Sequence, residues 1–225
     1  MPINDLLAHH RAAVLASVAV VAQVQAADLG RPTPCAEWTL ADLLAHMTAQ
    51  HHGFAAAARG RGGEHAAWEV RPATVAGYTA AAEDVLAAFA EPEVPQREFE
   101  LPEFRPVSRF PAAQAISFHL IDYVVHGWDV ARSLGLDHHL APDLAGPALR
   151  IALAVPDGDN RLEPGAAFGP ALAVDDDADP LHRILALLGR SPEWTGYAAS
   201  AGPSSNPPSS TNSDPVANAA SSEAR

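Results

Sequence analysis

No proline interrupts the stretch Ser117-Phe-His-Leu-Ile-Asp-Tyr-Val-Val-His-Gly-Trp-Asp-Val-Ala131. Its apolar residues recur at helical spacing, which predicts the middle of a helix. His119, Asp122 and His126 follow one another at i, i+3 and i+7 and therefore share one side of that helix. Asp122 and His126 are four residues apart, so they are neighbours on the helix surface. A carboxylate and an imidazole placed in this way can hold one divalent cation together.

The composition predicts a helical globular protein. Hydrophobic residues make up 48% of the 225 residues, which is enough for a core, but aromatic residues make up only 6%. The alternating Val, Ile, Thr and Tyr runs that are typical of strands are nearly absent. Cys35 is the one cysteine, so the chain has no disulfide framework. That usage fits a reducing, cytoplasmic setting.

The charge of the chain excludes several classes of partner. Its 27 acidic and 14 basic residues give a net charge of −13, and the basic residues are all arginines. An acidic surface without an arginine cluster argues against nucleic acid and against anionic membranes. The longest apolar window, residues 12–24, is too short to span a bilayer, and no signal peptide is expected. We expect a cytoplasmic protein that is a monomer or a homodimer.

Apolar periodicity and stop signals predict an all-α protein with four main helices. We expect these helices over residues 3–27, 39–59, 75–90 and 111–135, with shorter helices over 142–155 and 180–188. The best candidate for a strand is 97–101. Four long helices with a crossing connection between the third and the fourth favour a four-helix bundle. We therefore predict a bundle over 1–140, a short helical extension over 141–195, and a disordered tail over 196–225 that is rich in Ser, Pro and Asn.

Three polar residues are predicted to meet inside the bundle. His46 lies beside the apolar face of the second helix, and Asp122 and His126 lie on the fourth. Two histidines and one carboxylate suit a catalytic zinc that keeps an open position. The same set suits iron, nickel or manganese. The alternative is that these are partly exposed polar residues in a chain with 11 histidines.

Other residues have both a functional and a structural interpretation. His119 is a further ligand, a partner of a ligand or a core histidine, and we favour the core histidine. Cys35 is a nucleophile or ligand, or else a small buried loop residue. Asp129 holds a ligand histidine or an arginine, or else lies on the surface.

Further residues have one expected place or role each. The tryptophans expected in the core are Trp38 and Trp128. The histidines expected in solvent are His51, His52, His138 and His139. The arginines that are candidates for binding a substrate carboxylate are Arg109, Arg132 and Arg161.

Two histidine-bearing segments resemble a known family. The segments are Pro32-Thr-Pro-Cys-Ala-Glu-Trp-Thr-Leu-Ala-Asp-Leu-Leu-Ala-His46 and Val125-His-Gly-Trp-Asp-Val-Ala-Arg132. They are similar to segments of the metal-binding proteins related to mycothiol-dependent maleylpyruvate isomerase. The loop at 165–169 and the closing segment at 180–190 resemble the same family, and the likeness runs from about residue 5 to residue 192.

The resemblance implies a DinB-like four-helix bundle with a divalent metal held by His46, Asp122 and His126. Zinc is the expected metal, with nickel and iron as alternatives. In the isomerase the middle ligand is a glutamate, and the larger isomerases carry a separate C-terminal domain where we expect only the short extension. The resemblance also implies a low-molecular-weight thiol such as mycothiol. A metal with an open position lowers the pKa of a bound thiol or water and presents it as a nucleophile.

The sequence therefore predicts a metal-dependent transferase or isomerase that uses a thiol and acts on a small molecule. One alternative is a metal-dependent hydrolase in which bound water replaces the thiol, and activity without added thiol would separate the two. Another is a non-catalytic metal-binding or stress-response protein, which a site closed by a fourth side chain would favour. The last is a helical interaction module that binds no metal.

Overall fold

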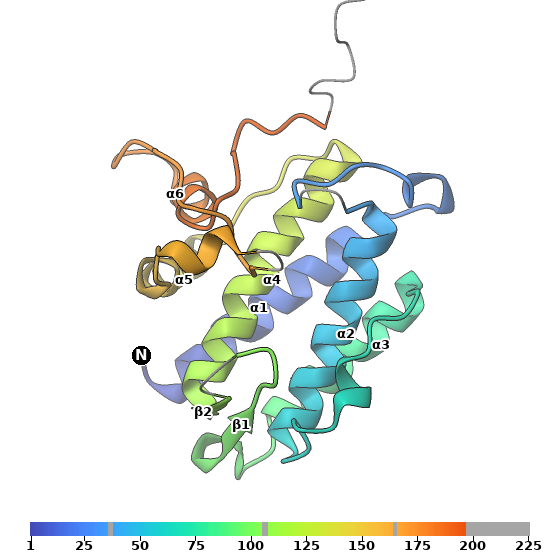
Figure 1. The fold of residues 1–225 in the computed structure, drawn as a ribbon, viewed down its shortest axis with the longest axis vertical. Coiled ribbons are helices and arrows are strands. Elements are labelled where there is room, and N and C mark those ends of the chain that lie inside the picture. Colours follow the sequence, from blue (N-terminus) through green and yellow to red (C-terminus); the bar gives the residue numbers. More distant parts are fainter. Residues whose placement is uncertain (36–37, 105–107, 164–165, 197–225) are drawn as a thin grey trace, which may run out of the picture.

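Four long helices form a bundle in the computed structural model, which describes residues 1–35, 38–104, 108–163 and 166–196. The helices are α1 (Ile3–Val21), α2 (Leu40–Ala58), α3 (Val75–Phe89) and α4 (Ala112–Leu134). α1 packs along α4 and α2 packs along α3, while α2 also contacts α4 (Figure 1). The all-α bundle predicted from the sequence is confirmed.

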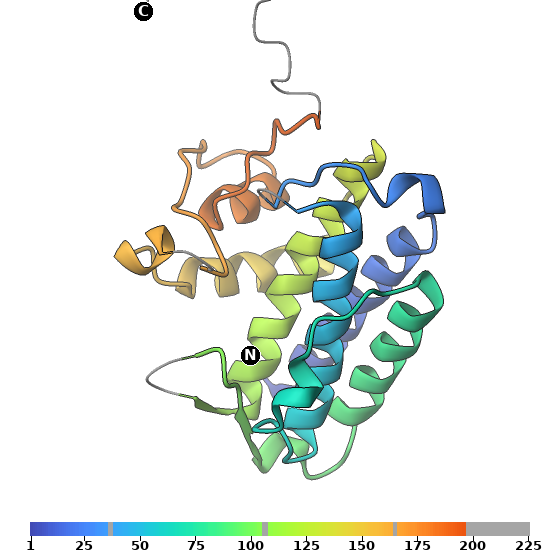
Figure 2. The ribbon, with the colours of Figure 1, turned by 45° about the vertical axis from the view of Figure 1, so that its right-hand side comes forward.

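Short elements complete the described part of the chain. The strands β1 (Glu98–Glu100) and β2 (Arg109–Pro111) pair in antiparallel register, with Phe99 opposite Phe110. The remaining helices are α5 (Pro142–Ala154) and α6 (Pro180–Leu187), and the 3-10 turns are η1 (Ala26–Asp28), η2 (His65–Trp68), η3 (Val94–Gln96) and η4 (Asp159–Leu162). α5 contacts α4 and α6, and Figure 2 shows α5 and α6 together beside α4. Residues 197–225 of the disordered tail predicted over 196–225 lie outside the described residues, as does Gly165 of the loop motif.

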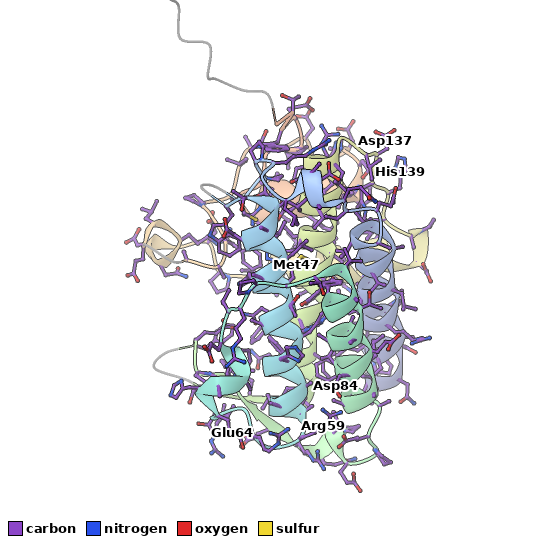
Figure 3. The ribbon with its side chains drawn as sticks, turned by 90° about the vertical axis from the view of Figure 1, so that its right-hand side faces the viewer. Met47, Arg59, Glu64, Asp84, Asp137 and His139 are labelled. Atoms are coloured by element: carbon purple, nitrogen blue, oxygen red, sulfur yellow. The ribbon has the colours of Figure 1, made fainter. Side chains whose placement is uncertain are left out.

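Local signals fix the two helices that carry the predicted ligands. Thr39 accepts a hydrogen bond from the backbone N–H of Asp42, and the Asp42 carboxylate accepts one from the backbone N–H of Thr39. This capping box begins α2 where the sequence predicts it. Gly135 ends α4 with φ of 73°, in the left-handed region that glycine adopts at little cost. Figure 3 shows Arg59, at the other end of α2, beside Asp84 of α3, to which it donates two hydrogen bonds.

The first helix is shorter than predicted. It ends at Val21 rather than near residue 27 because the chain turns to place Val24, only 7% exposed, in the core. A second capping box, between Gln25 and Asp28, then starts η1. The loop that follows is held against the bundle, since Arg31 donates to the Ser133 carbonyl near the end of α4. The segment that leads into α2 is therefore attached to both ligand-bearing helices.

Three buried histidines from three helices form a hydrogen-bonded row in the core. His10 Nε2 lies 2.8 Å from His119 Nδ1, and His119 Nε2 lies 3.3 Å from His51 Nδ1. Burial lowers the pKa of His10 to about 3, and it lowers the pKa of His119 and His51 well below the ordinary value. The prediction that His51 is solvated is therefore wrong. Its ring is fully buried and stacks on Tyr123 with ring centroids 4.1 Å apart.

Among the residues described, none of the helices combines the length and the apolar character needed to cross a bilayer.

Candidate metal centre

The three predicted ligands come together between α2 and α4. His46 lies on α2, next to Met47, which Figure 3 labels, and Asp122 and His126 lie on successive turns of α4. One ligand atom of each residue lies within 4.8 Å of the others. His126 Nε2 and Asp122 Oδ1 are 3.3 Å apart. Two ligand atoms of a tetrahedral zinc site are about 3.3–3.4 Å apart, so this edge already has the required spacing.

A second carboxylate fixes the orientation of His126. Its Nδ1 lies 2.9 Å from Asp129 Oδ2, and the Asp129 side chain is fully buried. Because an ionised carboxylate can only accept, Nδ1 carries the proton that is donated to it. Nε2 is then the ring nitrogen that faces Asp122 and His46, and it offers a lone pair to a cation that replaces its proton. This is the carboxylate–histidine arrangement that orients metal-binding imidazoles.

The charges around the group favour a cation. Burial lowers the pKa of His46 to about 4, and the positive charge of His126 adds to this effect, so a bare imidazole nitrogen is available at neutral pH. Burial alone would raise the pKa of Asp122, but His126 and His46 hold it below the usual value. Burial alone would lower the pKa of His126, but Asp122 and Asp129 raise it well above the usual value. Two carboxylates thus favour positive charge at this position, which a divalent cation also supplies.

Asp129 is saturated by donors from three separate segments. Arg190 Nε lies 3.2 and 3.3 Å from the two carboxylate oxygens, and the Cys35 thiol donates to Oδ2 at 3.1 Å. Arg190 Nη2 also donates to Cys35 Sγ at 3.1 Å. Asp129 is therefore a buried partner of a histidine and an arginine, and the surface alternative is wrong. Cys35 is buried, as its structural interpretation predicted.

A second group of potential ligands shares His126 with the first. Cys35 Sγ, a ring nitrogen of His126 and an Asp129 oxygen also lie within 4.8 Å of one another. The guanidinium of Arg190 contacts both the sulfur and the carboxylate of this group. A metal ion placed there would face that positive charge in a buried setting. The group of His46, Asp122 and His126 is therefore the candidate metal centre.

The candidate centre offers three potential ligands within the described residues. His119 is not a fourth, because both of its ring nitrogens bond to His10 and His51, and this agrees with the core histidine that we favoured. Three ligands would leave a coordination position for water or substrate on a bound ion, as in catalytic zinc sites.

An aromatic side chain lies against one of the proposed ligands. The Trp38 ring lies 4.8 Å from the ring of His46 and is 37% exposed, so its prediction as a core residue is wrong. Trp128 is 3% exposed, which confirms the prediction for that residue. One turn beyond His46, Gln50 donates to a carboxylate oxygen of Glu103 at 3.3 Å. An exposed indole thus flanks one ligand of the site.

The three arginines predicted as carboxylate-binding candidates have structural partners. Arg161 is 6% exposed and donates to the backbone carbonyls of Val155, Pro156, Gly169 and Leu187. Arg132 donates twice to the Trp194 carbonyl, and Arg109 pairs with Glu100 on the neighbouring strand. These contacts hold the C-terminal extension and the small sheet in place.

Comparison with known proteins identifies a family for this chain. A sequence model described as the mycothiol maleylpyruvate isomerase N-terminal domain matches residues 10–131. The chain belongs to this family. The match includes His46, Asp122, His126 and Asp129, and it ends before Arg190.

Relatives and solved structures extend the likeness. Two uncharacterized proteins of Mycobacterium tuberculosis, Rv0738 and MT0763, are each 32% identical to this family member over 192 residues, which is 83% of the chain and 98% of the relative. The crystal structure of the mycothiol-dependent maleylpyruvate isomerase superposes with a TM-score of 0.50 at 16% identity, over 68% of this chain and 69% of that one. A mutant of the same isomerase superposes with a TM-score of 0.53 at 15% identity, over the same fractions of the two chains. At these identities the structures establish the DinB-like fold.

Sequence reasoning did not single out Arg190 as part of the site. It stands 61 residues after Asp129, and such a separation carries no periodic signal. The one available signal was its place as the last residue of the closing segment that resembles the isomerase family.

Proposed function

We propose that this member of the mycothiol maleylpyruvate isomerase family binds one divalent metal ion through His46, Asp122 and His126, and that this ion is zinc. The observation that carries the proposal is the orientation of His126. Its Nδ1 is committed to Asp129, while its Nε2 stands 3.3 Å from Asp122 Oδ1 and near His46. The donor set of two imidazoles and one carboxylate matches that of catalytic zinc sites.

We further propose that the protein is a thiol-dependent transferase or isomerase acting on a small molecule. A metal bound here would supply a lowered pKa for a thiol or water at its open position. His46 is held neutral by burial and keeps a nitrogen free for the ion, and Asp129 prevents His126 from turning. The solved relative is described as mycothiol-dependent, which supports mycothiol or another low-molecular-weight thiol as the cosubstrate.

The experiment that tests this function uses cobalt as a coloured substitute for zinc. Wild type, His46→Ala and His52→Ala are loaded with Co²⁺, and the visible spectrum is recorded before and after addition of mycothiol. His52 is an exposed histidine on the same helix and serves as the matched control. We expect a new thiolate-to-cobalt absorption band in wild type and His52→Ala but not in His46→Ala.

Two other results of this experiment would contradict the proposal. A wild-type protein that does not take up cobalt contradicts the metal site. A cobalt spectrum that mycothiol leaves unchanged contradicts thiol use and favours the hydrolase, in which water occupies the open position.

A further inference from the structure

We propose that Arg190 is a positioning residue of the metal centre. Through Asp129 it holds His126 in the orientation that binds metal, so the C-terminal extension contributes to metal affinity. This inference rests on the metal site proposed above. It concerns a residue that lies outside the segment matched by the family.

The contacts form one continuous chain from the extension to the ligand. Arg190 is 9% exposed, Asp129 and Cys35 are 0% and 7% exposed, and His126 is 4% exposed. The guanidinium reaches both oxygens of Asp129 at 3.2 and 3.3 Å, and Asp129 receives the Nδ1–H of His126 at 2.9 Å. Cys35, from the loop before α2, contacts both the carboxylate and the guanidinium.

The electrostatics show why Asp129 needs this arginine. A fully buried carboxylate loses its hydration, and Arg190 is the permanent positive charge that contacts it. Arg190 and His126 both contact the carboxylate of Asp129, from opposite segments of the chain. Without the guanidinium the carboxylate loses its charged partner in the core and can turn away from its place. Its hydrogen bond to His126 then weakens, and His126 becomes free to rotate.

A tight turn at Gly189 sets the direction of the Arg190 side chain. Gly189 has φ of 75°, and a side chain there would come within 2.7 Å of the Gly169 backbone. The N–H of Arg190 then bonds back to the Leu185 carbonyl at the end of α6. The turn closes α6 and directs Arg190 from the extension toward α4. The extension is thus joined to the metal centre by a charged side chain as well as by apolar packing.

The test is a double-mutant cycle read out as zinc affinity. The dissociation constant for Zn²⁺ is measured by competition with a chromophoric chelator for wild type, Arg190→Gln, Asp129→Asn and the double variant. We expect Arg190→Gln to weaken zinc binding by about 10- to 100-fold, as for other residues that orient metal ligands. In the Asp129→Asn background the same substitution should have no further effect, because Arg190 acts through Asp129.

Two controls separate positioning from folding. Arg183→Gln removes a more exposed arginine of α6 that pairs with Asp176, and it should leave the zinc affinity unchanged. Arg190→Lys keeps the charge but has fewer donors, and it should recover part of the affinity lost in Arg190→Gln. A positioning role predicts this recovery, whereas circular dichroism shows whether each variant remains folded.

The outcomes that overturn the inference differ from those that overturn the metal site. If wild type binds zinc and Arg190→Gln binds it equally well, Arg190 does not position the site. If the fold-changes in the Zn²⁺ dissociation constant caused by Arg190→Gln and Asp129→Asn simply multiply in the double variant, Arg190 acts independently of Asp129. That result also contradicts the inference. If wild type binds no zinc, the proposed function and the inference both fail.

Discussion

Replacing His10 with phenylalanine should make the protein less sensitive to acid. His10 is 1% exposed, and burial lowers its pKa to about 3, while an unfolded histidine titrates at about 6.5. Below pH 6.5 the unfolded chain therefore binds a proton at this position that the folded chain does not bind until near pH 3. The stability that depends on neutral His10 is complete above pH 6.5 and is lost as the pH falls.

The size of the effect follows from linkage. One such group changes the free energy of unfolding by about 1.4 kcal/mol per pH unit below its unfolded pKa, or about 2 kcal/mol in total between pH 7 and pH 5. His51 and His119 also have pKa values lowered by burial, and they remain in the variant. The difference between wild type and His10→Phe therefore reports mainly the proton that His10 takes up on unfolding. Loss of the 2.8 Å hydrogen bond to His119 lowers the stability of the variant by about 1–3 kcal/mol, and this cost largely cancels when the two pH values are compared.

The assay is urea unfolding followed by circular dichroism at pH 7 and pH 5. Wild type should lose about 2 kcal/mol more stability than His10→Phe across this interval. His65→Gln, which changes an exposed histidine, should behave as wild type. Equal losses in wild type and His10→Phe would refute the reasoning, because they would show that folding does not shift the titration of His10.

Three further predictions concern the frame of the site. Gly189→Ala should lower the stability by about 2 kcal/mol or more in thermal unfolding, because φ is 75° and the new side chain would meet the backbone of Gly169; an unchanged melting temperature would contradict this. Thr39→Ala removes the cap of α2 and should cost about 1 kcal/mol in urea unfolding, whereas no loss would mean that the capping box does not matter. Addition of Ni²⁺ should quench tryptophan fluorescence. Trp38→Phe should remove most of that quenching, because Trp38 lies against His46. Equal quenching in both proteins would place the metal elsewhere.

Local sequence signals predicted most of the fold. The capping pair Thr39 and Asp42 marked the start of α2, and Gly135 marked the end of α4, because each satisfies backbone groups that a helix end leaves free. The end of α1 was not predicted. An apolar stripe continues past Val21 in the sequence, but Val24 reaches the core through a turn, and periodicity alone does not distinguish the two.

The proximity of the three proposed ligands was predictable because they share helix faces with apolar residues. Asp122 and His126 are one turn apart, and that spacing survives in any α-helix. His51 was misjudged although a signal was present, since it follows Met47 by four residues and both side chains face the core. The contact between Arg190 and Asp129 had no local signal, because it joins segments that only the tertiary fold brings together.

The central claim is tested most directly by the metal content of protein purified without a histidine tag. Elemental analysis is performed on wild type, His46→Ala and the matched control His52→Ala after incubation with zinc and with nickel, followed by dialysis. The account predicts about one divalent ion per chain in wild type and His52→Ala, and none in His46→Ala. Wild type that holds no metal, or His46→Ala that holds as much as wild type, would contradict it.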